Sequence, residues 1–398
     1  MKYDLVFEGG GAKGMVFVGA CEELFGRNHG FGRLLGTSAG AITATLLAAG
    51  YSPQEMLAAL AEKGADGKSV FSSFMGRPRE FTDSELATCG TAKLLDGVDL
   101  TFVPDWLEKS AHKQLLKSLA GVGAFRHVLA LIERGGWFGA DSFITWMTVR
   151  LGSGQWNGGV RGFSAMTLRQ FFEATKVELS LVASDTTSGS ILVLNHRTAP
   201  DCPVVWAVRM SMSIPLVWEE VSWKPEWGKY QERDMASHLI VDGGVLSNFP
   251  IELFISDAPQ VRKLMGETTA NTVLGMLIDE KLAVTKGFLV KTNIKLGDLS
   301  MVQRLGRLVD TATGAHDKLV LEEYAHLVAR LPAQSYGTTE FDMSDERRTA
   351  LVAAGREAMK MYLDAGTTGG LMLPTKAAMP GGKAETAADR VARGVLAQ

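Results

Sequence analysis

Residues 5–50 have the sequence LVFEGGGAKGMVFVGACEELFGRNHGFGRLLGTSAGAITATLLAAG, in which short apolar runs alternate with glycine-rich turns. We expect strands at Leu5–Phe7 and Arg33–Leu35, because each run is short, apolar and followed by glycine. We expect helices at Met15–Phe25, which has apolar residues on one face, and at Ala39–Ala49, which is rich in alanine. This order of strands, glycine turns and helices predicts an α/β fold with a mostly parallel sheet.

The chain as a whole is long enough for one large domain. It has 398 residues, 46% of them hydrophobic, so it can bury a sizeable core. Further strands are predicted at Glu178–Ala183, Ile191–Leu194, His238–Val241 and Val273–Ile278. Further helices are predicted at Leu168–Thr175 after a Thr167 cap, at Leu299–Leu331 and at Asp345–Leu363, with a helix start or tight turn at Ser211–Pro215.

Two stretches depart from this alternation. Residues 65–129 lack a strong period but hold aromatic and basic residues in a helical background, so we interpret about 65–130 as a helical insertion. Residues 366–398 are rich in Gly, Ala and Thr, which predicts a mobile tail. The predicted domain therefore spans residues 1–365, with the insertion inside it.

Charge and cysteine content exclude several classes. The balance of 41 Lys and Arg against 44 Asp and Glu gives a formal net charge of −3, so no global positive field attracts nucleic acid. The three cysteines, Cys21, Cys89 and Cys202, are far apart and have no C-x-x-C spacing. This indicates neither a zinc site nor a disulfide framework, but buried or free thiols in a reducing compartment. We expect no metal site.

The N-terminus carries no recognisable targeting signal. Met1–Asp4 runs directly into a strand-like segment, without a signal-peptide pattern. No apolar stretch reaches the length of a membrane span. We therefore expect a soluble, cytoplasmic protein, and we note that secretion without a cleaved signal would leave no trace in the sequence.

Gly9, Gly11 and Gly14 fit the pattern G-x-G-x-x-G between a strand and a helix, and this pattern has three interpretations. A dinucleotide site would need an acidic residue closing the next strand, but that strand ends in Leu34-Leu35-Gly36. A phosphate-binding loop would need Gly-Lys followed by Ser or Thr, whereas Lys13 precedes Gly14. The third interpretation is an oxyanion hole, in which glycine amides converge and Lys13 adds a cation. A tight turn without a ligand stays open at this point.

Gly36-Thr37-Ser38-Ala39-Gly40 matches G-x-S-x-G between a strand and a helix, the context in which this motif exposes a nucleophilic serine. Gly36 and Gly40 permit a sharp turn, and the next helix directs its N-terminus at Ser38. The alternative is a helix-capping serine. Because both glycine turns follow parallel strands, they should meet at the same edge of the sheet.

A nucleophilic serine needs a base, and the sequence offers histidines or an aspartate. None of the 7 histidines lies in a late strand-end loop, where an α/β-hydrolase would place one, and His238 is the best of them. Asp242-Gly243-Gly244 ends the apolar strand Leu239–Val241, so the Asp242 carboxylate projects at a strand end. Asn248-Phe249-Pro250 follows and fixes the turn geometry. The alternative is an ordinary structural Asp-Gly turn.

Four motifs in this order resemble the blocks of the patatin-like phospholipase family. Glu8–Gly14 resembles its glycine-rich oxyanion block, and Gly36–Gly40 its nucleophile elbow. Arg209–Pro215 is similar to its third block, which is rich in serine and ends in proline, and Asp242–Gly244 to its aspartate block. Weaker similarity covers three further stretches, which are Gly135–Leu151, Thr167–Asp185 and Phe341–Leu363. The ordered set is more specific than any single motif.

The resemblance implies a three-layer fold, with a mostly parallel central sheet flanked by helices, and a Ser38–Asp242 dyad without histidine. Asp242 would take the Ser38 proton, and the reaction would need no metal or organic cofactor. The implied oxyanion hole consists of Gly9, Gly10, Gly11, Lys13 and Gly14. Glu8 and Lys13 stand where family members often have Asp and Arg, and both departures are chemically mild.

The resemblance implies hydrolysis of lipid carboxylic esters, of the phospholipase A or lysophospholipase type, through an acyl-enzyme. Two other classes stay open. One is a dinucleotide-binding oxidoreductase, against which stands the absence from this sequence of the acidic residue that would bind the ribose. An effector on the same fold, activated by a partner protein or a messenger, would keep both dyad residues. The head group, the acyl position, any activator and the oligomeric state are not encoded in a readable pattern.

A lipid ester as substrate implies peripheral contact with a membrane surface. Exposed aromatic residues helped by nearby cations would provide it. The best candidate is the Phe71–Met75 cluster beside Arg77 and Arg79, which we expect in an exposed loop, and the second is Trp106 with Lys109 and Lys113.

Overall fold

The strands of the protein were located in a computed structural model, which describes residues 1–64, 67–96, 114, 116–118, 120–284, 324–368 and 386–396. The strands in these residues are β1 (Lys2–Phe7), β2 (Gly30–Thr37), β3 (Gly136–Phe138), β4 (Gln155–Trp156), β5 (Gly159–Val160), β6 (Leu179–Asp185), β7 (Ser190–Leu194), β8 (Leu216–Trp218), β9 (Val221–Ser222), β10 (Leu239–Asp242), β11 (Thr272–Asp279) and β12 (Val328–Pro332).

The helices of the same residues fall into longer α-helices and short 3₁₀ turns. The α-helices are α1 (Val16–Gly26), α2 (Ala39–Ala48), α3 (Pro53–Leu60), α4 (Asp83–Thr88), α5 (Gly90–Asp96), α7 (Gly123–Arg134), α8 (Asp141–Gly152), α9 (Leu168–Thr175), α10 (Val204–Ser211), α11 (Glu252–Ile255), α12 (Pro259–Met265), α14 (Asp345–Thr368) and α15 (Ala387–Leu396). The 3₁₀ turns are η1 (Gly11–Met15), η2 (Val70–Phe74), η3 (Pro225–Trp227), η4 (Gly243–Val245) and η6 (Ala325–Leu327).

The central sheet is mostly parallel, as the sequence predicts. β12, β11, β1, β2 and β6 lie side by side in this order and run in one direction. β7 and β10 join β6 in the opposite direction, and β9 extends β10. The register places Phe7 opposite Gly36, so the loop after β1 and the turn after β2 leave the sheet at one edge.

Two strands meet head to head beside β6. Thr37 at the end of β2 pairs with Val182, and Asp242 at the end of β10 pairs with the next residue, Ala183. Since β7 occupies the other side of β6, β2 and β10 share the same side and approach each other from opposite directions. The ends of β2 and β10 therefore converge on one point of the sheet.

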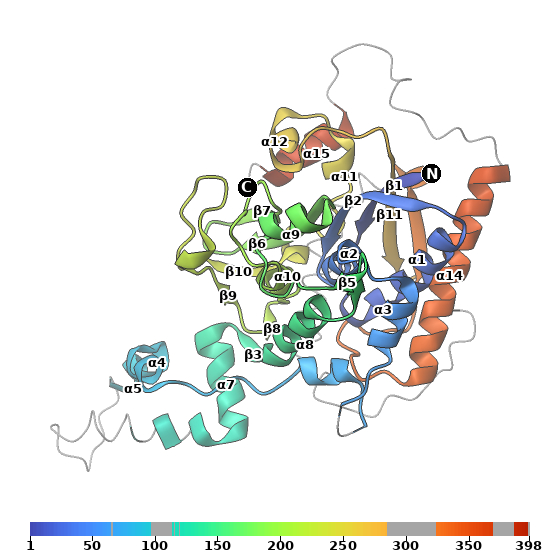
Figure 1. Ribbon diagram of the computed structural model, residues 1–398. Helices are drawn as coiled ribbons and strands as arrows, with labels where there is room; N and C mark the ends of the chain where they lie inside the picture. The colour runs from blue at the N-terminus through green and yellow to red at the C-terminus, as the bar shows by residue number, and fades with distance from the viewer. Residues whose placement is uncertain are drawn as a thin grey trace, which may run out of the picture.

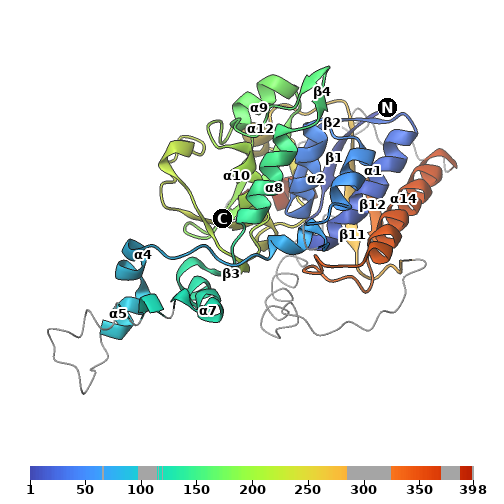
Figure 2. The same ribbon diagram turned by 60° about the horizontal axis from the view of Figure 1, so that its bottom comes forward.

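Helices cover both faces of the sheet, which gives three layers (Figures 1 and 2). Leu5 and Phe7 point to a core shared with α1, α2 and α14, whereas Val6 between them points to a second core. That second core contains residues of α11, α12 and α15, for example Ala392. The alternation follows from the two-residue period of a strand that is buried on both faces.

The arm formed by α4, α5 and α7 projects from this body (Figures 1 and 2). It has a small core of its own, to which Leu86 and Leu129 contribute. The described residues of the predicted insertion form η2, α4, α5 and α7, with a non-helical stretch at 75–82, and η2 packs into the main core against α8. Trp106, Lys109 and Lys113 lie outside the described residues.

Two expectations from the sequence need correction. The predicted helix Leu299–Leu331 lies outside the described residues up to position 323, and its end forms η6 and the edge strand β12. Pairing with the distant strand β11 decides this structure, and local propensity does not show such pairing. Residues 387–396, which the sequence assigns to a mobile tail, form α15, in which Ala388 and Ala392 are buried and Asp389 accepts a hydrogen bond from Ser256.

Candidate active site

Ser38 stands between β2 and α2 in an unusual backbone conformation, with φ 54° and ψ −119°. A positive φ is uncommon outside glycine, so the turn holds this serine under strain. Gly40 allows α2 to start this close to the sheet, because a Cβ there would lie 2.3 Å from the Phe7 carbonyl oxygen. The local structure is therefore the sharp strand-to-helix turn that G-x-S-x-G predicts.

The Ser38 hydroxyl donates a hydrogen bond of 2.6 Å to Oδ2 of Asp242. Both residues are buried. The other carboxylate oxygen, Oδ1, accepts a hydrogen bond of 2.7 Å from the Gly244 amide, the second residue of η4. The structure thus brings together the two residues that the sequence analysis selected, through the head-to-head meeting of β2 and β10.

Burial raises the pKa of Asp242 to about 7, and the hydrogen bonds from Ser38 and the Gly244 amide oppose this rise. Desolvation dominates because the carboxylate has lost water and has only two donors in its place. A carboxyl group that titrates near neutrality can accept a proton and return it during one reaction cycle.

The glycine loop after β1 lies next to Ser38. A Cβ on Gly9 would lie 3.2 Å from the Ser38 Cβ, and one on Gly14 would lie 2.5 Å from the Ala39 Cβ. Gly11 has φ 55°, and within the described residues the amides of Gly10 and Gly11 have no hydrogen-bond acceptor. The loop therefore presents free N–H donors close to the serine.

The Lys13 side chain does not face Ser38, although the sequence analysis assigns it to the oxyanion hole. It is buried, its ammonium group forms a salt bridge with Glu280 just after β11, and its side chain is not among the residues that line the pocket beside Ser38. A paired cation contributes less positive potential at Ser38 than a free one would. Lys13 thus ties the start of η1 to the end of β11.

Asn248 connects the glycine loop to the aspartate turn. Its backbone oxygen accepts from the Gly9 amide at 3.1 Å, and its side-chain Nδ2 donates to the Gly9 carbonyl at 3.0 Å and to Glu8 at 3.2 Å. Glu8 in turn accepts a hydrogen bond of 2.6 Å from the Ile278 amide. The sequence analysis gave Asn248 a role only in its own turn. No local pattern reveals contacts between residues 239 positions apart.

Comparison with known proteins places this chain in a family. Residues 5–255, which include both Ser38 and Asp242, match the patatin-like phospholipases. The chain belongs to the patatin-like phospholipase family. The fold is accordingly the patatin fold, with a mixed, mostly parallel sheet flanked by helices. Family membership supports a lipid hydrolase in general terms.

Individual relatives and solved structures are similar over most of the chain. The uncharacterized protein YqhO of Bacillus subtilis (strain 168) is 30% identical over 370 residues, which are 91% of this chain and 98% of YqhO. The crystal structure of VipD from Legionella pneumophila matches with a TM-score of 0.44 and 16% identity, covering 91% of this chain and 67% of VipD. ExoU of Pseudomonas aeruginosa, solved in complex with SpcU, matches with a TM-score of 0.38 and 18% identity. The chain spans about half of ExoU, since 91% of this chain covers 52% of it.

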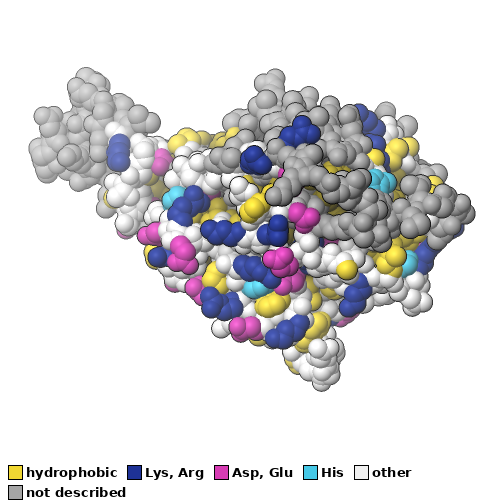
Figure 3. Space-filling model, turned by 90° about the horizontal axis from the view of Figure 1, so that it is seen from above, with side chains coloured by type: hydrophobic (Ala, Val, Ile, Leu, Met, Phe, Trp, Pro, Cys, Tyr) yellow, Lys and Arg dark blue, Asp and Glu magenta, His cyan; other side chains and the backbone are white. Residues whose placement is uncertain are grey.

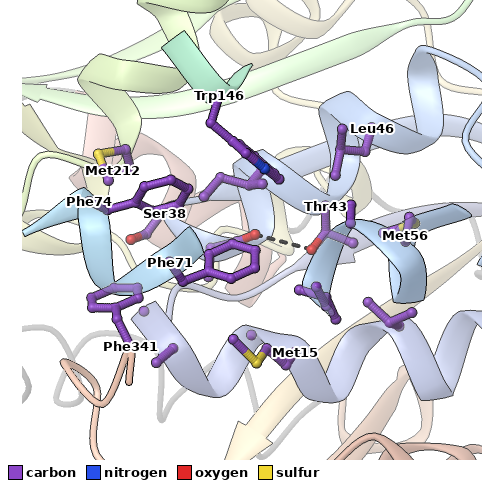
Figure 4. A pocket seen from close by; sticks show the side chains of 18 of the residues that line it. Met15, Ser38, Thr43, Leu46, Met56, Phe71, Phe74, Trp146, Met212 and Phe341 are labelled. Atoms are coloured by element: carbon purple, nitrogen blue, oxygen red, sulfur yellow. Dashed lines mark hydrogen bonds between the residues drawn. The ribbon is translucent and has the colours of Figure 1, made fainter. Parts of the chain in front are cut away.

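An apolar pocket opens beside Ser38 in this patatin fold (Figure 4). The space inside it, including the part open to solvent, is about 700 Å³. Its wall follows α2 from Ser38 to Leu46, eight residues or about 12 Å of helix. Figure 4 shows Leu46 and Met56 on the side away from Ser38. The pocket is thus an elongated apolar space with the serine at one end, which suits an acyl chain.

Phe71 and Phe74 belong to this pocket and are not an exposed loop. They are 6% and 1% exposed, and their rings pack against each other and against Trp146 of α8. The expectation that they adsorb to a membrane is therefore wrong. The two serines of this cluster serve a short 3₁₀ turn and not an exposed loop, because the Ser72 hydroxyl donates to the Ser69 carbonyl at 2.7 Å and the Ser73 hydroxyl to the Val70 carbonyl at 2.6 Å.

No histidine of the described residues hydrogen-bonds to Ser38 or Asp242. His238, the best candidate from the sequence, lies at the opposite end of β10 from Asp242, and its Nδ1 is 2.8 Å from Asp185 Oδ2. Asp185 also accepts from the Ser188 hydroxyl and amide in the β6–β7 turn. His238 therefore supports this turn, remote from the serine.

Two features are absent from the described residues. They contain no group of three or more His, Cys, Asp or Glu side chains placed to hold a metal ion. They also contain no helix with the length and hydropathy needed to cross a membrane. On the face shown in Figure 3, basic and acidic side chains are interspersed.

Proposed function

We propose that this patatin-like protein hydrolyses carboxylic esters of lipids, with Ser38 as the nucleophile and Asp242 as its base. The observation that carries the proposal is the 2.6 Å hydrogen bond from the Ser38 hydroxyl to the buried Asp242 carboxylate, at one end of an apolar pocket. A serine on a strained turn, a base in contact with it and an apolar site beside both are the parts that ester hydrolysis needs.

In the first half of the reaction, Ser38 Oγ attacks the ester carbonyl carbon while its proton passes to Asp242 Oδ2. The carbonyl oxygen becomes an oxyanion. When the tetrahedral intermediate collapses, the bond to the leaving alcohol breaks and Asp242 returns the proton to that alcohol. An acyl group then remains on Ser38.

In the second half, water attacks the acyl-enzyme and gives its proton to Asp242. Collapse of the second intermediate releases the fatty acid and returns the proton to Ser38. Asp242 acts as base and acid in turn, which its pKa of about 7 permits near neutral pH. The proton transfers of this cycle involve only Ser38, Asp242, the leaving alcohol and water.

The oxyanion needs hydrogen-bond donors, and the glycine loop supplies the best candidates. The amides of Gly10 and Gly11 have no acceptor within the described residues and belong to the loop that touches Ser38. The start of α2 adds the positive end of its helix dipole at the same place. We propose that these amides bind the oxyanion, with Lys13 acting through η1 and not by direct contact.

The acyl chain is proposed to lie in the pocket along α2. Its lining is almost entirely apolar, with Met15, Phe71, Phe74 and Trp146 around the space (Figure 4). The alcohol part of the ester would leave toward solvent, where lipid head groups remain hydrated. Since such esters lie at a bilayer surface, peripheral membrane contact and a phospholipid substrate are part of the proposal.

A fluorophosphonate probe tests the assignment of the nucleophile, because it reacts with activated serines. The wild-type protein should be labelled, and peptide mapping should find the label on Ser38. Ser38→Ala should abolish labelling and ester hydrolysis while keeping the thermal unfolding midpoint. Labelling of Ser38→Ala at the wild-type rate would refute the assignment.

A second arm tests whether the pure protein is competent by itself. Fatty-acid release from phospholipid vesicles should be measured with and without eukaryotic cell extract. Release by the pure protein supports an autonomous hydrolase, and release only with extract supports the activated effector of the same fold.

A further inference from the structure

The segment at the C-terminal end of α10 contacts both the pocket and the Ser38–Asp242 pair, although the proposed reaction does not use it. From Ser211 to Ile214, successive side chains alternate between the buried interior and the wall of the pocket. Met212 and Ile214 line the pocket, whereas Ser211 and Ser213 are fully buried and bond to the residues of the pair.

Ser211 holds the backbone of the nucleophile. Its hydroxyl accepts a hydrogen bond of 3.0 Å from the Ser38 amide and donates one of 2.6 Å to the carbonyl of Val182 on β6. A serine in a helix ordinarily bonds back to its own helix. Even Ser213, two residues beyond α10, donates to the Arg209 carbonyl of that helix at 2.5 Å. The Ser211 hydroxyl leaves its helix instead and joins the strained turn to the sheet.

Ser213 holds the backbone of the base in a similar way. Its carbonyl oxygen accepts a hydrogen bond of 2.9 Å from the Asp242 amide. Arg209 fixes Ser213 in place, since its guanidinium donates to the Ser213 hydroxyl and, at 2.6 Å, to the Glu219 carbonyl. One short segment thus contacts the main chain of both members of the pair.

We propose that Ser211 is a positioning residue, and that Ser211 and Ser213 together form a brace that sets the separation of Ser38 and Asp242. The inference rests on the proposed function, because it gives the brace a purpose in ester hydrolysis. The nucleophile has a positive φ that only surrounding contacts can maintain, and the Ser211 hydroxyl is the acceptor for its amide. Without that bond the turn can relax and lengthen the contact between Ser38 and Asp242.

The brace also connects the wall of the pocket to the Ser38–Asp242 pair through consecutive residues. Met212 lies between Ser211 and Ser213 in the sequence and lines the pocket. An acyl chain in contact with Met212 is therefore also in contact with the braced segment. We therefore expect loss of the brace to lower the rate of the chemical step and to leave binding of the acyl chain nearly unchanged. Misplacement of reacting atoms by about 1 Å can reduce rates by about 10²-fold.

The test compares Ser211→Ala with Ser180→Ala. Ser180 is also buried, lies on β6, and accepts one hydrogen bond, from the Asn195 side chain, without touching the pair. Ser211→Ala should reduce kcat on a soluble ester by about 10- to 100-fold with KM nearly unchanged. Ser180→Ala should keep the wild-type kcat, and Ser211→Thr, which retains a hydroxyl, should recover at least part of the lost rate.

Hydrogen exchange separates this inference from the proposed function. Protection of the Ser38 amide, measured in a peptide that covers residues 36–42, should fall in Ser211→Ala and not in Ser180→Ala, whether or not the protein hydrolyses esters. Unchanged protection in Ser211→Ala would overturn the brace. So would equal losses of kcat in the two alanine variants, because Ser211 would then act through stability alone. An inactive wild type with the expected exchange pattern would overturn the proposed function and leave the brace supported.

Discussion

The pKa of Asp242 sets a pH profile that can be calculated in advance. If Asp242 is the base, only its ionised form can take the Ser38 proton, and kcat/KM reports the free enzyme. With a pKa of about 7, the ionised fraction is about nine-tenths at pH 8 and about one-tenth at pH 6. We therefore expect kcat/KM to fall about tenfold between these pH values, and roughly 100-fold between pH 8 and pH 5.

The assay needs a neutral, short-chain ester, so that neither substrate ionisation nor vesicle charge contributes to the profile. Products should be separated and quantified at each pH, at constant ionic strength. His238→Gln is the matched control, because a histidine base would also titrate near neutrality. Its profile should coincide with that of the wild type, since His238 bonds to Asp185 and not to the pair.

Two results would refute the reasoning. A rate that stays constant from pH 8 to pH 5 would mean that Asp242 remains ionised throughout, against the desolvation that raises its pKa, or is not the base. A profile that vanishes in His238→Gln would assign the titration to the histidine and restore a Ser–His–Asp mechanism.

Three further outcomes are expected. Folding raises the pKa of Asp242 from 3.8 to about 7, so the wild type should lose up to about 1.4 kcal/mol of unfolding free energy per pH unit as pH rises through this window. Asp242→Asn should lack that loss. Urea unfolding midpoints that change with pH equally in the wild type and in Asp242→Asn would contradict this expectation. Ala59→Leu fills the pocket beside Leu46 and should reduce hydrolysis of long-chain esters more than of short-chain ones, whereas Ala58→Leu on the exposed side of α3 should not. Hydrolysis of a soluble ester should survive EDTA, and loss that a single divalent ion restores would contradict metal-independent chemistry.

The sequence predicted well those parts of the fold that local chemistry decides. Glycine at three positions before a helix, and G-x-S-x-G after a strand, fix the backbone of the two turns wherever the rest of the chain goes. The Thr167 cap was predicted for the same reason, and its hydroxyl accepts from the Gln170 amide as expected. Asp242 could be selected as a candidate base because an apolar strand ends at it.

The remaining features depend on pairing between distant segments. Val328–Leu331 becomes a strand only because β11 offers an edge, and Phe71 and Phe74 are buried because η2 packs against α8. Lys13 was expected to face the oxyanion, and Glu280 is what directs it elsewhere. Sequence spacing carries no information on such partners, and the membrane-adsorption expectation failed for this reason.

The meeting of β2 and β10 offers a physical reason for the proposed Ser38–Asp242 reaction without histidine. In a triad, an imidazole spans the gap between serine and aspartate, so the two need not touch. Here Thr37 and Asp242 pair with consecutive residues of β6, which leaves the serine hydroxyl and the carboxylate in direct contact at 2.6 Å. A side chain inserted between them would have to separate two strands of one sheet. The topology therefore fits the proposed direct proton transfer from Ser38 to Asp242, and burial raises the pKa of this carboxylate to about 7.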